Sequence, residues 1–420
     1  MKKIGLFLTC VMFVSLFMGV ISTSSAIKVL VEKNSLLENS SGIITVDNEG
    51  DGDFTNIKDA VNAAKTGDII EVYSGIYYEN VIVDKQLTLK GITKELGTGD
   101  DAGKPIIDSE GFGSLDSSNC SIRLKADRCV VENFTLINSG AFRGAGIKIY
   151  SNYNVIQNNI ISNNWYGIYP LEESSFNFFY NNEIKNNDVF GIKCGGLFDD
   201  NCSDNNISNN KIHNNRAGVA VAPRDIVYNN TIFGNSDGII LESENAKVIK
   251  NTIYENENGI FVHESNLIVK NNNISNNNVG VNIFYLSKGS LTIYNNLTKN
   301  DIGVIAQDCK YCSINYNNFF NNTVQAIFVY LQKPKITNWN RNYWSDWKTT
   351  NRRPIEGKVV IDRWPGTHEE YSLTQYDKSP SKDPINGTKA KIKIINIPLF
   401  LQRFFQRFPF MVKILNQILI

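Results

Sequence analysis

Short runs of alternating hydrophobic and polar residues recur through most of the chain, and turns rich in asparagine and glycine separate them. Between residues 150 and 330 one phrase returns: paired asparagines, a nearby isoleucine, a further asparagine, and then glycine followed by isoleucine or valine. Copies begin at Asn158, Asn209, Asn229 and Asn271. Alternation with a period of two indicates strands, and asparagine and glycine mark the turns between them. The pattern therefore predicts an all-β repeat protein.

The repeats have a nearly constant length. Their glycines lie 20 to 27 residues apart, at Gly146, Gly167, Gly191, Gly218, Gly238, Gly259, Gly280 and Gly303. One coil of this length cannot bury its own apolar residues, whereas coils stacked about 4.8 Å apart can. We therefore predict a single-stranded right-handed parallel β-helix over residues 44–335, N-terminal cap included. One inward column would be formed by Ile161, Ile184, Ile212, Ile232, Ile253 and Ile274.

The asparagines suit the turns of such a fold in two ways. Asparagine tolerates the left-handed backbone conformation that sharp turns require. Identical carboxamides one coil apart can also hydrogen-bond to one another as a ladder. We expect both roles in the turns of the solenoid.

The ends of a solenoid need covers, because exposed strand edges recruit other chains. Residues 54–65 predict a short N-terminal capping helix, with Thr55 as N-cap and Gly67 after its end; its apolar face would be Ile57, Ala60, Val61 and Ala64. Residues 336–385 break the repeat and predict a tryptophan-rich C-terminal cap. Exposed tryptophans that stack on sugars are the alternative for this segment.

Both termini differ from the repeats. Residues 1–26 resemble a secretory signal peptide, with Lys2 and Lys3 before an apolar stretch and small residues at 24–26, so we expect a secreted or cell-surface protein. A retained membrane anchor is the alternative. Residues 386–420 are basic, contain no acid, and repeat apolar residues at helical spacing. They predict an amphipathic helical tail that contacts a membrane surface through residues 394–420, docks on the solenoid, or associates with a second copy.

The charge of the chain is balanced, with 42 basic and 42 acidic residues. Nucleic-acid-binding proteins usually carry a basic footprint, so we do not expect a nucleic-acid partner.

Apart from Cys10 in the signal segment, the cysteines fall in three close pairs, Cys120 with Cys129, Cys194 with Cys202, and Cys309 with Cys312. In an exported protein this spacing predicts local disulfides. Buried thiols are the alternative, and a zinc site is disfavoured because no suitable histidine spacing exists.

Two segments suggest a family. Residues 51–61, 67–68 and 72–80, which include Gly75, Tyr77 and Glu79, resemble the opening of many extracellular carbohydrate-acting β-helix proteins. Asn342-Tyr343-Trp344 resembles the closing segment of prokaryotic surface proteins with NosD-type β-helix repeats. The resemblance covers residues 44–385 and implies the fold more strongly than an activity, because the matching residues build turns and caps.

The NosD label also implies copper, but the solenoid contains no methionine, and its histidines, His213 and His263, are predicted to be surface turn residues. The best catalytic candidates lie on the longest repeat. Asp199, Asp200 and Asp204 form an acidic insertion that could hold calcium, although no cofactor is expected otherwise. The next coil supplies Arg216, Arg224 and Asp225, and an arginine there could contact an acidic sugar. A solvated acidic loop is the simpler interpretation.

Three functions follow from this pattern. The first is a non-catalytic extracellular or cell-surface protein that binds carbohydrate or cell-envelope components. The second is a polysaccharide lyase, hydrolase or epimerase, although the aspartate motifs of the known hydrolases are absent. The third is a periplasmic-type accessory protein for copper or another metal cofactor.

Overall fold

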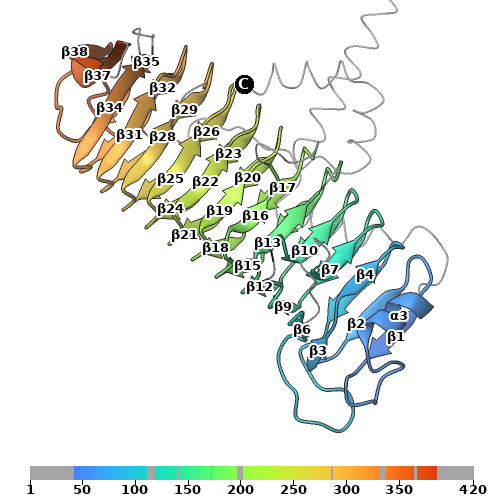
Figure 1. Cartoon of the computed structure of the whole chain (residues 1–420). Helices are drawn as coiled ribbons and strands as arrows, with labels where there is room; N and C mark the ends of the chain where they lie inside the picture. The colour runs from blue at the N-terminus through green and yellow to red at the C-terminus, as the bar shows by residue number, and fades with distance from the viewer. Residues whose placement is uncertain are drawn as a thin grey trace, which may run out of the picture. The chain divides into compact units, whose positions relative to one another are not determined.

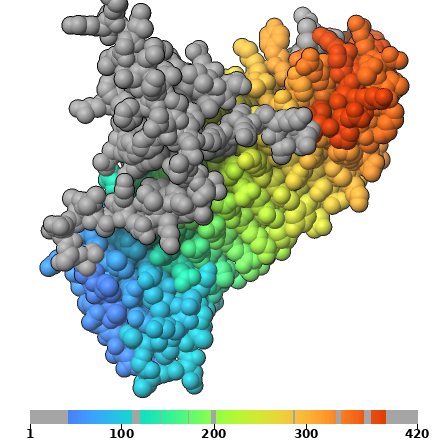
Figure 2. Space-filling model, turned by 180° about the vertical axis from the view of Figure 1, so that it is seen from behind, coloured from blue at the N-terminus to red at the C-terminus, as the bar shows by residue number. Residues whose placement is uncertain are grey.

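The computed structural model describes residues 42–110, 119–140, 142–171, 173–195, 202–284, 287–331, 337–363 and 367–385. The expected signal peptide, the expected C-terminal tail, and the candidates Asp199 and Asp200 lie outside these residues. Within them, each coil contributes one strand to each of three sheets in the order A, B, C, and successive coils stack in sequence order (Figure 1). The space-filling view shows the same progression of colour from coil to coil (Figure 2).

The three sheets contain short strands that are paired in parallel. Sheet A contains β1 (Ile43–Val46), β2 (Ile69–Val72), β5 (Thr88–Gly91), β8 (Val130–Glu132), β11 (Val155–Gln157), β14 (Phe178–Tyr180), β17 (Asn206–Ser208), β20 (Ile226–Tyr228), β23 (Lys247–Ile249), β26 (Ile268–Lys270), β29 (Leu291–Ile293), β32 (Ser313–Asn315) and β35 (Asn338–Asn340). Sheet B contains β3 (Ile76–Tyr78), β6 (Ile106–Asp108), β9 (Thr135–Ile137), β12 (Ile160–Ser162), β15 (Glu183–Lys185), β18 (Lys211–His213), β21 (Thr231–Phe233), β24 (Thr252–Tyr254), β27 (Asn273–Ser275), β30 (Asn296–Thr298), β33 (Asn318–Phe320) and β36 (Tyr343–Trp344). Sheet C contains β4 (Val81–Val83), β7 (Cys120–Leu124), β10 (Ala145–Ile149), β13 (Tyr166–Pro170), β16 (Phe190–Lys193), β19 (Ala217–Ala220), β22 (Asp237–Leu241), β25 (Asn258–Val262), β28 (Val279–Ile283), β31 (Ile302–Gln307), β34 (Val324–Leu331), β37 (Arg353–Arg363) and β38 (Thr367–Asp377), of which the last two pair antiparallel.

The predicted inward column is confirmed. The six isoleucines pair strand by strand from Ile161 to Ile274 in sheet B, and all are fully buried. The column continues through Leu297 and Phe319 to Trp344. Because one inward side chain per strand lies directly over its counterpart, the apolar interior is continuous from coil to coil.

Paired asparagines divide the two predicted roles between them. In the turn from sheet A to sheet B, Asn158 has a φ of 59° and is exposed, whereas Asn159 is buried. The Oδ1 of Asn182, one coil on, accepts the backbone N–H of Asn159 at 3.0 Å and its Nδ2–H at 3.1 Å. The same bonds repeat through Asn210, Asn230, Asn251, Asn272, Asn295, Asn317 and Asn342. We call this column the A–B ladder.

Glycine recurs at the start of the sheet C strands for a steric reason. A Cβ atom built on Gly238 would lie 2.5 Å from the carbonyl oxygen of Gly259 in the next coil. Only glycine permits the backbone to come this close where sheet C begins.

One helix, α3 (Ile57–Ala63), lies in the described part of the chain. Its buried residues Ile57, Ala60 and Val61 join the solenoid core, and it packs beside β1, β2 and β4. The expected N-cap, Thr55, is wrong: the Oδ1 of Asn56 accepts the Asp59 N–H at 2.8 Å. The Glu79 carboxylate accepts the N–H groups of Ile57 and Lys58 at 2.8 and 2.9 Å, which supplies further acceptors at this helix start.

The repeat continues past the boundary expected at residue 335, because β35 and β36 still pair with β32 and β33. Trp339 and Trp344 are buried among core residues, so these two rings are not available for stacking on sugars. The antiparallel pair β37–β38 then follows on the edge of sheet C. It positions Asp377, whose Oδ2 accepts the N–H and Nδ2–H of Asn342 at 3.0 Å each and thereby ends the A–B ladder.

The predicted disulfides are wrong: none of the six described cysteines forms one, although all six are buried. Cys120 lies outside the solenoid core and pairs with Ala145 in sheet C, whereas Cys129 lies in the core. The remaining thiols contact other polar groups. The Sγ of Cys312, for example, donates to the Ser287 carbonyl at 3.5 Å. The hydrogen bond with the Cys309 thiol and then burial raise the pKa of Cys312, so both favour the protonated thiol.

Candidate functional site

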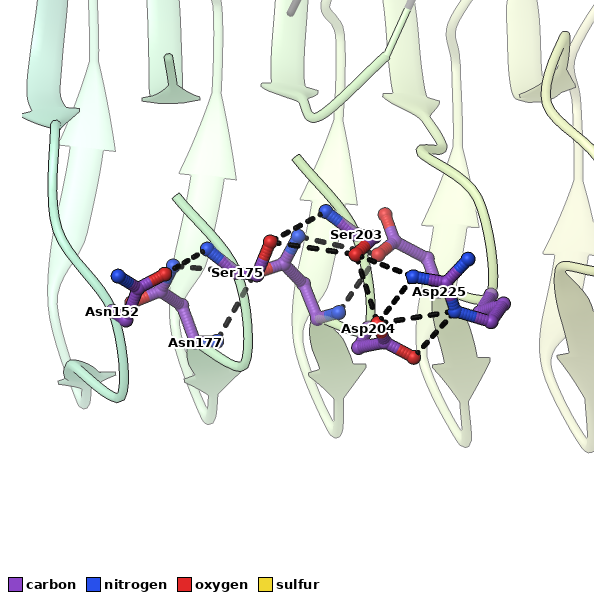
Figure 3. A network of polar contacts seen from close by, with 8 residues as sticks. Asn152, Ser175, Asn177, Ser203, Asp204 and Asp225 are labelled. Carbon is purple, nitrogen blue, oxygen red and sulfur yellow. Dashed lines mark hydrogen bonds and ion pairs between the residues drawn. The ribbon is translucent and has the colours of Figure 1, made fainter. Parts of the chain in front are cut away.

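The turn from sheet C to sheet A contains a polar network that includes three of the predicted site residues, Asp204, Arg224 and Asp225 (Figure 3). Asn152, Ser175 and Ser203 follow one another along successive coils: the Ser175 N–H donates to Asn152 Oδ1 at 2.7 Å, and the Ser203 N–H donates to Ser175 Oγ at 3.0 Å. The Ser203 hydroxyl then donates to Asp204 Oδ2 at 2.8 Å. These hydrogen bonds thus connect the turns of successive coils and reach Asp204.

Asp204 and Arg224 form a bidentate ion pair. The Nη2 and Nε atoms of Arg224 lie 2.7 and 2.9 Å from the two carboxylate oxygens, and Nη2 also donates to Ser203 Oγ at 2.8 Å. The Arg224 side chain is 55% exposed and that of Asp204 is 26% exposed. In this fork geometry both carboxylate oxygens are hydrogen-bonded by the arginine. The pair therefore stabilises the turn between sheets C and A, and Asp204 is not placed to act as a general acid or base.

Asp225 has a structural role that could not be predicted from its position in the sequence. It is fully buried, and its Oδ1 accepts the N–H and Nδ2–H of Asn205 at 2.8 and 3.2 Å, while Oδ2 accepts the Ala222 N–H at 2.8 Å. It ends a short ladder formed by Asn154, Asn177 and Asn205. On the next coil the equivalent residue is Ala246, which has no side-chain acceptor, so the column needs a terminal group that only accepts.

Burial raises the pKa of Asp225 to about 7, although its hydrogen bonds from Ala222 and Asn205 act in the opposite direction. Between its ordinary pKa of 3.8 and a pH of about 7, the Asp225 carboxyl therefore keeps its proton in the folded protein and loses it in the unfolded chain. The free energy of unfolding should fall by roughly 2–4 kcal/mol as the pH rises from about 4 to about 7, and then level off. Urea unfolding of Asp225→Asn should show a flatter pH dependence than the parent over this range. Asp188→Asn, at an exposed site, should keep the parental slope; equal slopes in both variants would exclude this role for Asp225.

Arg216 does not join this network. Its backbone carbonyl accepts the N–H groups of Ser236 and Asp237 in the turn from sheet B to sheet C, at the opposite end of β19 from Arg224. Of the predicted residues that the structure describes, it thus brings together Asp204, Arg224 and Asp225, and the Asp225 side chain points into the ladder.

A second feature lies on the outer face of sheet C, and the sequence patterns did not predict it. Two columns of outward residues follow the strands β7, β10, β13 and β16. The first contains Cys120, Ala145, Tyr166 and Phe190, and the second contains Arg123, Lys148, Tyr169 and Lys193. None of these positions is acidic. We call the two columns, with Phe142 and Trp165 beside them, the basic aromatic face.

The rings and cations of this face contact one another. The centroids of Tyr166 and Tyr169 lie 4.8 Å apart at 63°, and Tyr166 lies 5.9 Å from Phe190. The Nζ of Lys193 lies 5.3 Å from the centroid of Phe190 and 5.8 Å from that of Tyr169. These are ordinary distances for edge-to-face ring pairs and for cation–π contacts.

The basic aromatic face is unevenly accessible. Phe142 is exposed and lies 5.6 Å from the half-buried Trp165, whereas Lys148 and Tyr169 are buried. Arg123 is half-buried next to Lys148 in the same column. The sequence did contain a signal. In these coils a cation or ring stands directly before the repeat glycine or two residues after it, as in Tyr166 and Lys193, whereas among the later repeat glycines through Gly303 only Gly259 has such a neighbour, Phe261.

The residues present do not fit a copper site. Within the described residues, no group of three or more His, Cys, Asp and Glu side chains is placed to hold a metal ion. His213 is not a turn residue as expected: it lies on β18, is buried, and its Nε2 is 3.2 Å from Glu183 Oε1. Its ring stacks on Phe233 with centroids 4.6 Å apart. His213 therefore belongs to a packed row of side chains on sheet B.

Comparisons with known proteins agree with the fold. Solved structures with similar folds include the A-modules of two Azotobacter vinelandii mannuronan C-5 epimerases, AlgE6 and AlgE4. AlgE6 is 15% identical over 77% of this chain and 92% of its own, with a TM-score of 0.56. AlgE4 is 15% identical over 68% and 87%, with a TM-score of 0.52. PfbA, a surface adhesin of Streptococcus pneumoniae, is 11% identical over 78% and 95%, with a TM-score of 0.49.

A search of curated proteins finds no match. None of the helices within the described residues has the length and apolar character required to span a bilayer. Residues 110–246 match the family model described as a right-handed β-helix region, and residues 184–359 match the model described as periplasmic copper-binding protein (NosD). The chain is therefore a right-handed parallel β-helix protein, and its residues 184–359 are similar to NosD.

Proposed function

We propose that this protein works outside the cytoplasm and binds an acidic polysaccharide, without modifying it, across the basic aromatic face of sheet C. The observation that carries the proposal is that cations and aromatic rings share the outer face of sheet C on successive coils. Phe142 is exposed and Arg123, Trp165 and Phe190 are half-buried at its surface, whereas Lys148 and Lys193 are buried beneath it. Successive coils repeat at about the strand-to-strand distance of 4.8 Å, so the same chemistry recurs along the solenoid axis. A polymer with a regular repeat can meet such an array over several of its units.

The chemistry of the face suits uronate sugars. Ammonium and guanidinium groups pair with carboxylates, and the apolar faces of pyranose rings pack on aromatic side chains. The similarity in fold also supports a uronate ligand, since the epimerases with similar folds are named for mannuronan. The NosD match and the resemblance of the first segment to secreted carbohydrate-acting proteins support a location outside the cytoplasm.

The polar network around Asp204, Arg224 and Asp225 favours binding without catalysis. The side chains of Asp204 and Arg224 satisfy each other, and Asp225 is buried as the end of a ladder. A polysaccharide lyase, hydrolase or epimerase remains the alternative hypothesis. Incubation with polymannuronate, polyguluronate and polygalacturonate should yield neither unsaturated products nor new reducing ends nor a changed uronate ratio; any of these products would replace the binding hypothesis with an enzymatic one.

The binding test uses the full chain and the same three polymers in affinity electrophoresis and calorimetry. Trp165→Ala and Arg123→Gln should each weaken binding about tenfold, because each removes a half-buried contact worth roughly 1–2 kcal/mol. Binding should also weaken as the salt concentration rises. Phe233→Ala and Lys270→Gln are matched controls, since Phe233 also stacks on a ring and Lys270 also lies over one, 5.4 Å from Tyr294, but on sheets B and A. Equal losses in the controls, or no binding by the parent, would refute the proposal.

A further inference from the structure

A shallow groove of about 580 Å³ lies on the outer face of sheet B, away from the basic aromatic face. The strands β27, β30 and β33 form its floor, and Pro384 and Ile385 form one wall. Among the described residues its lining consists of Asn273, Ile274, Ser275, Asn296, Thr298, Asn318, Phe320, Pro384 and Ile385. The volume falls within the usual range for small-ligand sites.

The floor carries two rows of side chains in strict register. The first row is Asn273, Asn296 and Asn318, the first residues of the three strands. Asn296 Nδ2 donates to Asn273 Oδ1 at 2.9 Å, and Asn318 Nδ2 donates to Asn296 Oδ1 at 2.8 Å. Unlike the ladders inside the turns, this row is partly open, because Asn273 and Asn296 are exposed.

The second row combines hydroxyl groups with a ring. Ser275, Thr298 and Phe320 are the third residues of the same strands and are all half-buried. The Phe320 ring is held by Tyr343, with centroids 5.2 Å apart and tilted by 47°. A hydrogen-bonding row and an aromatic surface therefore lie side by side.

The wall of the groove is fixed by the floor. Ile385 donates its N–H to Asn318 Oδ1 at 2.7 Å, and Asn318 Nδ2 donates to the Ile385 carbonyl at 2.8 Å. One carboxamide thus satisfies both the backbone N–H and the backbone carbonyl of Ile385. The groove is formed before a ligand arrives, which lowers the entropic cost of binding.

The lining selects for the chemical class of ligand. No charged side chain lines the groove among the described residues, so neither an acidic nor a basic ligand would find a counter-charge. An extended peptide fits poorly, because its side chains on one face repeat every 6.6–6.8 Å or so, whereas the carboxamides repeat at about 4.8 Å. Carboxamides and hydroxyls can both donate to and accept from sugar hydroxyls, and the ring can pack on a pyranose face.

We propose that this groove binds an uncharged oligosaccharide, with Asn273 and Asn296 contacting its hydroxyl groups and Phe320 packing on one sugar ring. The site is separate from the basic aromatic face in both location and ligand charge. The protein would then hold two different glycans, one acidic and one neutral, on two of its sheets.

The test measures binding of chitohexaose, cellohexaose and maltohexaose to the full chain by calorimetry and saturation-transfer NMR. The parent should bind at least one of them, and Asn296→Ala and Phe320→Ala should each weaken that binding about tenfold or more. Thr252→Ala and Tyr254→Ala are matched controls, because they occupy the same two rows on β24, outside the groove, and should change affinity less than about twofold. Thermal unfolding midpoints show whether each variant is folded.

Three results would overturn the proposal: no binding of any of the three neutral hexasaccharides at millimolar concentration, equal binding by the groove variants and the parent, or equal losses in groove variants and controls. Trp165→Ala and Arg123→Gln should leave neutral-sugar binding unchanged. Failure of the acidic-polysaccharide proposal and failure of this one are therefore separate outcomes.

Discussion

Replacing Asn230 by alanine should lower the free energy of unfolding by about 3–5 kcal/mol, although the substitution removes only one short polar side chain. The Oδ1 of Asn230 accepts the N–H and Nδ2–H of Asn210 at 2.9 and 3.0 Å, and its Nδ2 donates to Asn251 Oδ1 and the Ile207 carbonyl at 3.0 and 2.9 Å. All these groups are buried, so alanine leaves the Asn210 N–H without its acceptor and removes the side-chain bonds to Asn251 Oδ1 and the Ile207 carbonyl, although Asn251 Oδ1 still accepts the backbone N–H of residue 230. Urea unfolding followed by circular dichroism measures the loss.

Asn229→Gly is the matched control for this prediction. Asn229 is adjacent in sequence but exposed, and its side chain makes one hydrogen bond, to Asn209 Oδ1 at 2.7 Å. Its φ of 55° is readily adopted by glycine, so the variant should lose less than about 1 kcal/mol. Similar losses at both positions would mean that the ladder contributes no more than the surface turns.

Asp377→Ala should destabilise the last coil by about 4 kcal/mol or more, because it removes the acceptor at the end of the A–B ladder. Asp377 is fully buried and accepts five hydrogen bonds: three reach Oδ2 from Asn342 N, Asn342 Nδ2 and Trp344 Nε1, each at 3.0 Å, and two reach Oδ1 from the N–H groups of Arg341 and Ser379, each at 3.1 Å. Without the carboxylate these donors have no buried partner.

The effect of Asp377→Ala should be local at first. Hydrogen exchange should accelerate in β35, β36 and β38 before it does so in the central coils, because stacked repeats contact only their neighbours. The fluorescence of the buried Trp344 reports on the same coil. Asp383→Ala, at an exposed site, should leave exchange and fluorescence unchanged. Uniformly faster exchange along the whole solenoid would contradict the terminal role of Asp377.

Positions in the middle of the repeat could be predicted from sequence because each copy faces the same environment. The column through Ile232 and Ile253 and the asparagine ladder follow from a phrase that recurs at nearly constant spacing. The paired asparagines also have distinct surroundings, since Asn229 has a positive φ and Asn230 is buried. The pattern anticipated both roles, and only the structure assigned each role to its residue.

Predictions failed where a residue's role depends on another coil. Asp225 was predicted to lie with Arg224 in a candidate surface site, but the structure buries it as the last acceptor of a ladder, with Asn205 on one side and Ala246 on the other. The close spacing of Cys120 and Cys129 suggested a disulfide, yet only Cys129 belongs to the solenoid core. Sequence distance therefore gave no information about the face of the sheet on which each residue lies.

The sequence by itself determined the repeat, the strand class, the inward column and the need for left-handed turns, because these depend on a period that hydrophobic burial and backbone sterics impose on every coil. Only the tertiary structure decided where each ladder ends, which cations and rings share the outer face of sheet C, and where a groove opens on sheet B. Those features arise from residues about 20 or more positions apart, or from Ile385 crossing back to Asn318. Stacking sets such contacts, and no single repeat contains them.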